Sequence, residues 1–153
     1  MTLEIAIREA TNEDLAVLVP LYAALDLVGE RALSVERARE ILGRIRSYPH
    51  YRVFVATMAG RIVGAFSLLV MDTFAHTGAT AGIVEDVVVD GPWRRKGIGK
   101  QMMYFAMDYC REIGCHKMVL SSNMKREGAH RFYESLGFEK YGYSFAVSLQ
   151  QQP

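Results

Sequence analysis

The sequence of 153 residues predicts a mixed α/β (α+β) fold, with about seven strands and about four helices built around one central sheet. Three observations support this class. Runs of β-branched and aromatic residues alternate with segments whose apolar residues recur every three or four positions. The length suits one compact domain. Half of the residues are hydrophobic and 23% are charged, as in globular proteins. We expect a single domain over residues 1–149 and a frayed tail at 150–153.

The first part of the chain is expected to form a strand followed by two helices. Residues 5–7 are a short, mostly β-branched run. Thr11, with Asp14 three residues later, is typical of a helix start. Pro20 is expected to kink this first helix or to end it early, because proline lacks the amide hydrogen that the helix needs. Ser34 can cap the second helix through its hydroxyl oxygen.

Three strands are expected next. Residues 53–56 and 62–70 are strand-like runs on either side of Gly60, which indicates a hairpin. A loop at 72–79 follows. Residues 82–89 then form a β-branched run, which predicts a third strand.

The last third of the chain is expected to add two helices and three strands. A strong helical pattern starts at Ile98 and ends at Gly114, where glycine is typical of a helix C-terminus. Residues 117–121 read as a strand, and a shorter helix ends at Gly137. Residues 138–149 then predict two closing strands.

Charge and cysteine content exclude several classes of function. The formal net charge is +1, which gives no strong field to attract nucleic acid or an anionic membrane. The N-terminal residues lack the basic and apolar regions of a signal peptide, so the cytoplasm is the expected location. Cys110 and Cys115 are expected to be buried free thiols, and no histidine or cysteine pair has the spacing of metal ligands.

The most informative segment is a basic turn between the run at 82–89 and the helix that starts at Ile98. Gly97 and Gly99 leave out side chains where backbone amides can approach a ligand closely. The helix N-terminus adds unpaired N–H groups and a partial positive charge. The cations around this turn are Arg94, Arg95, Lys96 and Lys100. Together these features predict a site for a phosphate or pyrophosphate group.

Two other glycine motifs do not fit this turn. A nucleotide P-loop requires glycine where Arg94 stands and serine or threonine where Gln101 stands. A dinucleotide-binding fingerprint requires a third glycine where Met102 stands.

The pattern Arg94-x-x-Gly97-x-Gly99 resembles the pyrophosphate motif of the GNAT superfamily of N-acetyltransferases. Residues 131–138, Arg-Phe-Tyr-Glu-Ser-Leu-Gly-Phe, resemble the C-terminal signature of that family. Residues 5–14 resemble its first strand and helix, so the likeness covers nearly the whole chain.

Shorter stretches resemble two groups within the superfamily. Residues 84–89 are similar to glucosamine-6-phosphate N-acetyltransferases, and residues 121–126 with 129–133 are similar to aminoalkylphosphonate N-acetyltransferases. The resemblance implies a mostly antiparallel sheet and an acetyl-CoA-dependent transfer to the primary amine of a small molecule, by direct attack in a ternary complex. Two alternatives stay open, which are a protein or peptide N-acetyltransferase and a non-catalytic acyl-CoA-binding module.

The resemblance also implies which residues bind the cofactor. They lie in the strand before the turn, in the turn and near the C-terminal signature: Val87, Val88, Val89, Arg94, Arg95, Lys96, Gly97, Ile98, Gly99, Lys100, Asn123, Phe132 and Tyr133. Arg126 stands where many members have a cofactor-contacting asparagine, and either Asn123 or Arg126 is expected to replace it.

Acetyl transfer to an amine needs a base, because an ammonium group is not nucleophilic at neutral pH. Glu85 and Asp86 are successive strand residues and are expected to point to opposite faces of the sheet. The resemblance favours Glu85 as the base, directly or through water, and Tyr133 as the group that protonates the leaving sulfur. It also implies that the backbone N–H of Val87 or Val88 polarises the acetyl carbonyl at a bulge. The structural alternatives are carboxylates paired with local cations and a tyrosine that packs in the core.

The acceptor site is expected to be lined by two segments, by analogy with the family. They are the connection between the first two helices and the loop at 72–79. The candidate side chains are Tyr22, Asp26, Phe74, His76 and Asp86. Arg31, Arg37 and Arg52 could either hold a phosphate on the acceptor or be solvated surface charges. A homodimer is expected, with residues 144–147 at its interface.

Overall fold

A computed structural model describes residues 4–25 and 33–150 of the chain. Its residues form two compact units, one up to Leu120 and one from Ser121 onward. The first unit contains the sheet, and the second contains the last helix and the C-terminal segment.

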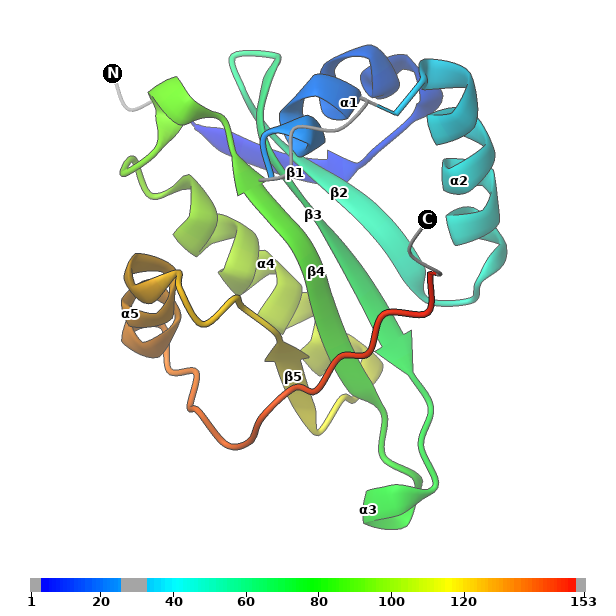
Figure 1. The fold of residues 1–153 in the computed structure, drawn as a ribbon, viewed down its shortest axis with the longest axis vertical. Helices are drawn as coiled ribbons and strands as arrows, with labels where there is room; N and C mark the ends of the chain where they lie inside the picture. The colour runs from blue at the N-terminus through cyan, green and yellow to red at the C-terminus, as the bar shows by residue number, and fades with distance from the viewer. Residues whose placement is uncertain (1–3, 26–32, 151–153) are drawn as a thin grey trace. The chain divides into compact units, whose positions relative to one another are not determined.

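The sheet of the first unit has five strands among the described residues, arranged in chain order (Figure 1). All neighbours are antiparallel except the last two, which are parallel. The strands are β1 (Ile5–Glu9), β2 (Tyr51–Met58), β3 (Arg61–Met71), β4 (Ala81–Val89) and β5 (Lys117–Leu120). The predicted hairpin is confirmed, because β2 and β3 pair on either side of Ala59 and Gly60.

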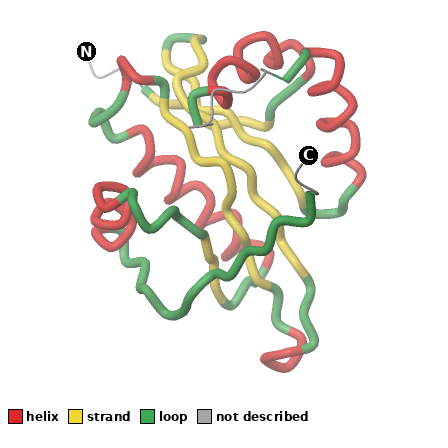
Figure 2. Tube along the Cα trace, in the orientation of Figure 1, coloured by secondary structure: helices red, strands yellow, loops and turns green. Residues whose placement is uncertain are grey.

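Helices cover both faces of this sheet (Figures 1 and 2). On one face, α1 (Leu15–Ala23) and α2 (Val35–Ser47) share a core with Val53 and Val55 of β2. On the other face, α4 (Ile98–Ile113) brings aromatic rings within 5.1–5.6 Å of Phe54, which lies between those two valines. Because successive side chains of β2 point to opposite faces of the sheet, each face contributes to a separate core.

The predicted helix signals act as expected at both N-terminal helices. Thr11 and Asp14 form a capping box around a 3₁₀ turn that leads into α1. The buried Asp14 carboxylate also accepts two hydrogen bonds from Arg8, at 2.7 and 2.9 Å. The Ser34 hydroxyl accepts a hydrogen bond from the backbone of the third residue of α2. Pro20 lies inside α1, which ends three residues later.

The loop expected at 72–79 contains one short turn, α3 (Ala75–Gly78), in which His76 and Thr77 have left-handed backbone angles. Both cysteines are free thiols, and Cys110 is buried as predicted, whereas Cys115 is only half-buried. Within the described part of the chain, no helix is both long and apolar enough to cross a membrane. Residues 4–25 and 33–150 also contain no cluster of potential metal ligands.

The second unit contains α5 (Glu127–Ser135), which ends before Gly137 as predicted. The prediction of two closing strands at 138–149 is wrong for this chain. All of these residues are described, and none of them is in a strand (Figure 2). The alternating pattern is present, but a strand needs a paired neighbour, and none pairs with this segment. Over residues 4–25 and 33–150 the sheet therefore has five strands and not about seven.

Candidate functional site

The turn predicted to bind pyrophosphate joins β4 to α4, and we call residues 94–100 the cofactor turn. A 3₁₀ turn (Gly91–Trp93) leads into it from the end of β4. Two residues then adopt left-handed backbone angles, Arg95 with φ 62° and Gly97 with φ 82°. Gly97 is the N-cap of α4, so the chain reverses tightly just before the helix begins. Ile98 is buried and fixes the first turn of α4 to the core.

The N-terminus of α4 is open for an anion. No side chain in the described part of the chain caps it, and none of the residues in its first turn is acidic. A Cβ atom placed on Gly97 would meet no described atom within 4 Å, so space lies in front of these backbone amides. An uncapped helix start with room before it can donate N–H groups to phosphate oxygens.

Cationic side chains surround this opening. Arg94, Arg95, Lys96 and Lys100 are all exposed. The Lys96 ammonium lies 5.2 Å from the Trp93 ring centre, and the Lys100 ammonium lies 5.7 Å from the Tyr104 ring centre. Arg94 Nε donates to the carbonyl oxygen of Val89 at 3.3 Å, which orients its guanidinium. The residues present therefore fit a bound diphosphate.

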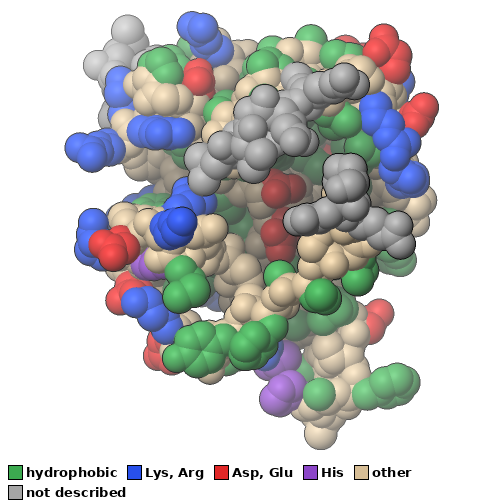
Figure 3. Space-filling view, in the orientation of Figure 1, with side chains coloured by type: hydrophobic (Ala, Val, Ile, Leu, Met, Phe, Trp, Pro, Cys, Tyr) green, Lys and Arg blue, Asp and Glu red, His purple; other side chains and the backbone are tan. Residues whose placement is uncertain are grey.

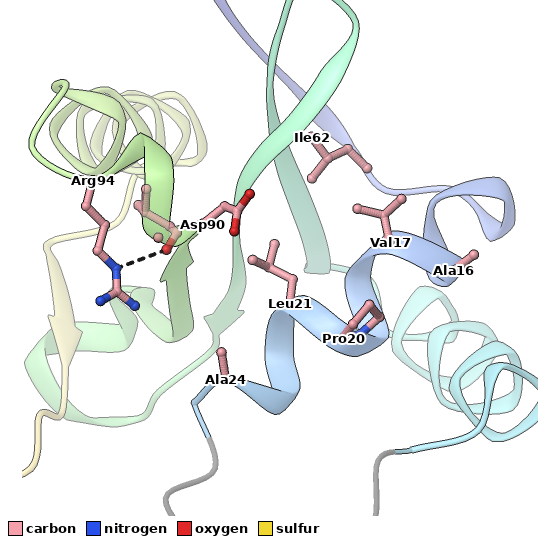
Figure 4. A pocket seen from close by; sticks show the side chains of 10 residues that line it. Ala16, Val17, Pro20, Leu21, Ala24, Ile62, Asp90 and Arg94 are labelled. Carbon is pink, nitrogen blue, oxygen red and sulfur yellow. Dashed lines mark hydrogen bonds between the residues drawn. The ribbon is translucent and has the colours of Figure 1, made fainter.

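A hollow of about 390 Å³ lies between α1 and the cofactor turn (Figure 4). Its wall is apolar along α1, and Asp90 and Arg94 supply charge at the end next to the turn. The residues that line it are Ala16, Val17, Pro20, Leu21, Ala24, Ile62, Val89, Asp90, Gly91 and Arg94. Pro20, considered before only as a helix breaker, thus forms part of a wall beside the turn.

β4 contains a bulge shortly before the cofactor turn. We call residues 85–88 the acidic bulge. On β3, Ser67 pairs with Glu85 and Ala65 pairs with Val88. The two β3 residues are two positions apart, but their partners on β4 are three positions apart, so β4 contains one extra residue. The extra residue is accommodated at Asp86, whose φ of 53° is left-handed. Such an inserted residue changes which face the following side chains occupy.

The bulge places both acids on one side of the strand, so the prediction of opposite faces is wrong. Paired strand residues share a face, and Ala65 and Val88 belong to the core beneath α1 and α2. Glu85 pairs with Ser67 and thus faces the same side. Burial and, after it, the nearby charge of Asp86 raise the pKa of Tyr22, a residue of α1 on this same face. In Figure 3, acidic side chains lie at the centre of the visible face, over β4.

The electrostatics of the acidic bulge suit a base. Burial raises the pKa of Glu85, and the neighbouring charge of Asp86 raises this pKa further. Both side chains are nevertheless exposed enough to meet a ligand. Neither carboxylate forms a salt bridge with any residue of 4–25 or 33–150, so the alternative of carboxylates paired with local cations is not supported.

Three further side chains surround the acidic bulge, and sequence reasoning singled out only Tyr22. Its hydroxyl is buried without a hydrogen-bond partner among the described residues, and burial with the nearby Asp86 raises its pKa. Tyr51, at the start of β2, has a pKa raised by burial and by both acids. Ser67 is a buried polar residue opposite Glu85. Tyr51 and Ser67 were missed because only the strand register brings them to the site.

Beyond the bulge, the backbone of β4 has no strand partner on its β5 side among the described residues. Pairing with β5 ends at Val84 and Leu120, just before Glu85. Val87 and Val89 are half-buried, whereas the Val88 side chain is buried in the core. A ligand can therefore contact Val88 through its backbone but not through its side chain.

The second unit holds the remaining candidates. The Tyr133 ring is buried and lies 5.3 and 5.6 Å from the rings of Phe132 and Phe138. Burial raises the pKa of the Tyr133 hydroxyl, and Arg126 partly opposes this. The Asn123 side-chain oxygen accepts a hydrogen bond from the Lys125 backbone at 2.9 Å, so its amide nitrogen is the group left for a ligand.

The other candidates for the acceptor site are either exposed or already in contact with other residues. Phe74 is fully exposed, and His76 lies against His116 with ring centres 4.7 Å apart. Arg37 pairs with an acid of its own helix, and Arg52 donates to three backbone carbonyls, so both already have structural roles. Asp26 and Arg31 lie outside the described residues.

Comparisons with known proteins find similar sequences and a similar solved structure. A family model described as "Acetyltransferase (GNAT) family" matches residues 19–138. A glucosamine 6-phosphate N-acetyltransferase from Trypanosoma brucei brucei is 37% identical over 98 residues, covering 64% of this chain and 65% of the relative, which is less than two thirds of its length. An aminoalkylphosphonate N-acetyltransferase from Salmonella typhimurium is 32% identical, covering 94% of this chain and 90% of the relative. The solved structure of the glucosamine-6-phosphate N-acetyltransferase from Arabidopsis thaliana superposes with a TM-score of 0.83 at 26% identity, over 96% of this chain and 99% of that one.

Proposed function

The chain belongs to the acetyltransferase (GNAT) family, and from this premise we propose that it moves the acetyl group of acetyl-CoA to the primary amine of a small molecule, by direct attack within a ternary complex. The observation that carries this proposal is the cofactor turn, where an uncapped helix start, an open Gly97 and exposed cations come together. Bound acetyl-CoA supplies the acetyl group as a thioester and leaves as the free thiol.

The cofactor turn holds the diphosphate in this proposal. Backbone amides of Gly97, Ile98 and Gly99 donate to its oxygens, and the side chains of Arg94, Arg95, Lys96 and Lys100 add positive charge. The open backbone edge of Val87, Val88 and Val89 binds the extended arm of the cofactor. Phe132 and Tyr133 of the family signature, with either Asn123 or Arg126 in place of the usual asparagine, are proposed as further cofactor contacts.

Glu85 is the proposed base. A primary ammonium group has a pKa of about 10 in water, so most acceptor molecules arrive protonated at neutral pH. The Glu85 carboxylate accepts one proton from this ammonium, directly or through a water molecule, and leaves a neutral amine that can attack. Its raised pKa makes it a better proton acceptor than an ordinary glutamate.

Two groups act on the acetyl carbonyl and on the leaving sulfur. The backbone N–H of Val87 or Val88, at the acidic bulge, donates to the carbonyl oxygen as negative charge develops there. The Tyr133 hydroxyl donates its proton to the sulfur when the carbon–sulfur bond breaks, and the phenolate regains a proton, directly or through water, from the acylated nitrogen, which thereby becomes a neutral amide. Its pKa is raised by burial, so the phenol carries that proton at neutral pH.

The acceptor is proposed to bind beside the acidic bulge. Asp86 and Glu85 attract its ammonium group, and the hydroxyls of Tyr22, Tyr51 and Ser67 offer hydrogen bonds. Phe74, His76 and Asp26 remain proposed contacts at the rim. An amino sugar phosphate and an aminoalkylphosphonate are the first acceptors to test, because two relatives carry these names. We further propose a cytoplasmic homodimer; its two free thiols suit a reducing compartment.

The test is a thiol-release assay with purified protein, acetyl-CoA and a panel of small amines and peptides. We expect stoichiometric free thiol and acetylated product with at least one small primary amine. Acetylation of peptides alone would favour a peptide acetyltransferase. Tight binding of acetyl-CoA with no thiol release from any acceptor would favour a binding module and contradict the proposed reaction.

A further inference from the structure

Two buried hydroxyl groups lie beside the acidic bulge. Ser67 is opposite Glu85 in the strand register, and its side chain is buried. Tyr22 packs against the core on the same face of the sheet, and its hydroxyl oxygen is buried without a hydrogen-bond partner among the described residues. Ser67 partly opposes the rise in the pKa of Tyr22, which places the two hydroxyls close together. Buried polar groups without a partner are rare in native proteins, so the Tyr22 hydroxyl needs an explanation.

The unpaired hydroxyl of Tyr22 is unfavourable for the fold itself. Burying a polar group without a hydrogen bond costs free energy, and a phenylalanine ring would fill nearly the same space without this cost. The Tyr22 ring packs against the apolar core beneath α1 and α2, and this contact does not require a hydroxyl. A role in binding a ligand therefore explains the hydroxyl better than a role in folding.

The hydrogen-bonding capacity of these groups indicates which ligand atoms suit them. A phenol and an alcohol can both donate a hydrogen bond, whereas an ammonium group can only donate and never accepts one. The ammonium group of the acceptor is thus matched to the two carboxylates of the acidic bulge, and the hydroxyls of Tyr22 and Ser67 are matched to an oxygen. Because Ser67 is directly opposite Glu85, this oxygen must lie close to the reacting nitrogen.

The charge of Asp86 indicates which kind of oxygen fits. Burial is the main cause of the raised pKa of Tyr22, and Asp86 adds to it because its negative charge disfavours a second negative charge at the phenol oxygen. No salt bridge with residues 4–25 or 33–150 neutralises the acidic bulge. The same field disfavours a carboxylate or phosphonate oxygen of a ligand at this position. A neutral hydroxyl oxygen is therefore favoured.

We propose that Tyr22 and Ser67 determine the acceptor specificity by binding a neutral hydroxyl group on the carbon next to the one that bears the reacting amine. The acceptor is then a 1,2-amino alcohol. This inference rests on the proposed transfer to an amine beside the acidic bulge, and it selects one substrate class for that reaction. An amine with a methyl group in place of this hydroxyl leaves the Tyr22 hydroxyl unpaired and is a poorer substrate.

The test compares three small amines of similar size as acceptors for the full chain. They are 2-aminoethanol, propylamine, in which a methyl group replaces the hydroxyl, and glycine, in which a carboxylate takes its place. In thiol-release assays, kcat/KM should be at least about tenfold higher for 2-aminoethanol than for propylamine, and glycine should be the poorest acceptor. An equal or higher kcat/KM for propylamine or glycine would overturn the proposal.

Two variants test whether Tyr22 causes this preference. Tyr22→Phe removes only the hydroxyl, and Tyr109→Phe makes the same change on α4, on the other face of the sheet. The preference for 2-aminoethanol over propylamine should fall about tenfold in Tyr22→Phe and stay unchanged in Tyr109→Phe. Differences in the intrinsic reactivity of the two amines cancel, because every protein acts on the same pair. An undiminished preference in Tyr22→Phe would contradict the assignment.

Thermal unfolding of the free proteins separates a binding role from a structural one. Tyr22→Phe should have a Tm equal to or above that of the wild type, because the deleted hydroxyl has no partner in the described part of the chain. A lower Tm would mean that the fold itself uses this hydroxyl, which is incompatible with the proposal.

Binding measurements keep this inference separate from the proposed reaction. If no amine releases thiol, the proposed transfer fails, and NMR titrations of the CoA-bound protein with 2-aminoethanol and propylamine then give the two values of Kd. A Kd about tenfold lower for 2-aminoethanol in the wild type, with similar values in Tyr22→Phe, would support the specificity. Equal Kd values in the wild type would exclude it.

Discussion

The cofactor turn and the acidic bulge lie a few residues apart on the same strand-to-helix segment, and they solve similar backbone problems differently. Both contain left-handed residues. In the cofactor turn, Gly97 takes such an angle without a side chain to strain it. In the acidic bulge, Asp86 takes a φ of 53° despite its side chain. Left-handed angles cost about 1–2 kcal/mol for most residues, so Asp86 stores strain in the bulge and Arg95, with a φ of 62°, stores strain in the turn, whereas Gly97 stores none.

The two sites also differ in whether local sequence or long-range strand pairing determines them. The cofactor turn depends on the local order of glycines and cations, and one stretch of sequence specifies it. The acidic bulge depends on how β3 and β4 pair, because Ser67 and Ala65 meet residues three apart on β4. Local sequence can reveal the first site, whereas the second needs the register.

The largest expected effect is at the acidic bulge, on the rate of reaction. Glu85→Gln removes the proposed base and should lower kcat by about 10²–10⁴-fold. The dissociation constant of CoA should change little, because the cofactor turn is untouched. Steady-state thiol release and calorimetric CoA titration measure the two quantities. Glu139→Gln, at an exposed position in the second unit, is the control and should behave as wild type. An unchanged kcat in Glu85→Gln would remove the assignment of the base.

At the cofactor turn, the largest effect is on affinity. Gly97→Val should weaken CoA binding by about 100-fold, or ~2.7 kcal/mol, because a side chain enters the space before the α4 amides. Gly60→Val is a matched control, since Gly60 has a similar φ of 76° and also has no described atom within 4 Å of a Cβ.

Thermal unfolding should show similar stability losses in these two glycine variants, of about 1–2 kcal/mol each from backbone strain. Calorimetry should show lost affinity only in Gly97→Val. Equal affinities in the two variants would separate the turn from cofactor binding.

A smaller effect should appear in the pH dependence. Glu85 must be deprotonated to accept a proton, so kcat/KM should fall as the pH drops through its raised pKa, at a higher pH than for an ordinary glutamate. Asp86→Asn removes one cause of the raised pKa, and the acid limb of the pH–rate profile should move to lower pH. Profiles of wild type and variant test this. A limb that does not move would mean that another group controls it.

The smallest effect concerns the strain in the bulge. Asp86→Gly should raise the free energy of unfolding, by less than about 1 kcal/mol, because glycine adopts the left-handed angle freely. The KM for the amine should rise in the same variant, because a charge that attracts the ammonium is lost. Denaturant unfolding and acceptor kinetics measure these changes. A clear loss of stability would show that Asp86 is not strained.

Much of the fold could be predicted because its signals are local. Ser34 caps α2, Gly114 ends α4, and Gly60 turns the hairpin through interactions within a few residues of chain. The wrong predictions concern long-range pairing. Asp86 changes face because of its partner strand, and residues 138–149 have strand character without a strand to pair with.

The candidate site divides in the same way. The cofactor turn was predicted residue by residue from its motif, and its geometry fits a diphosphate. Tyr51 and Ser67 carry no sequence signal of their own. They reach the acidic bulge only because β2, β3 and β4 pair in one register.

The central claim is that the amides at the start of α4 bind the diphosphate of CoA. Amide chemical shifts of ¹⁵N-labelled protein during a CoA titration test it most directly. We expect saturable shifts at Gly97, Ile98 and Gly99, with Gly60 unchanged as the internal reference. Saturable binding that leaves these three amides unshifted, while others move, would contradict it.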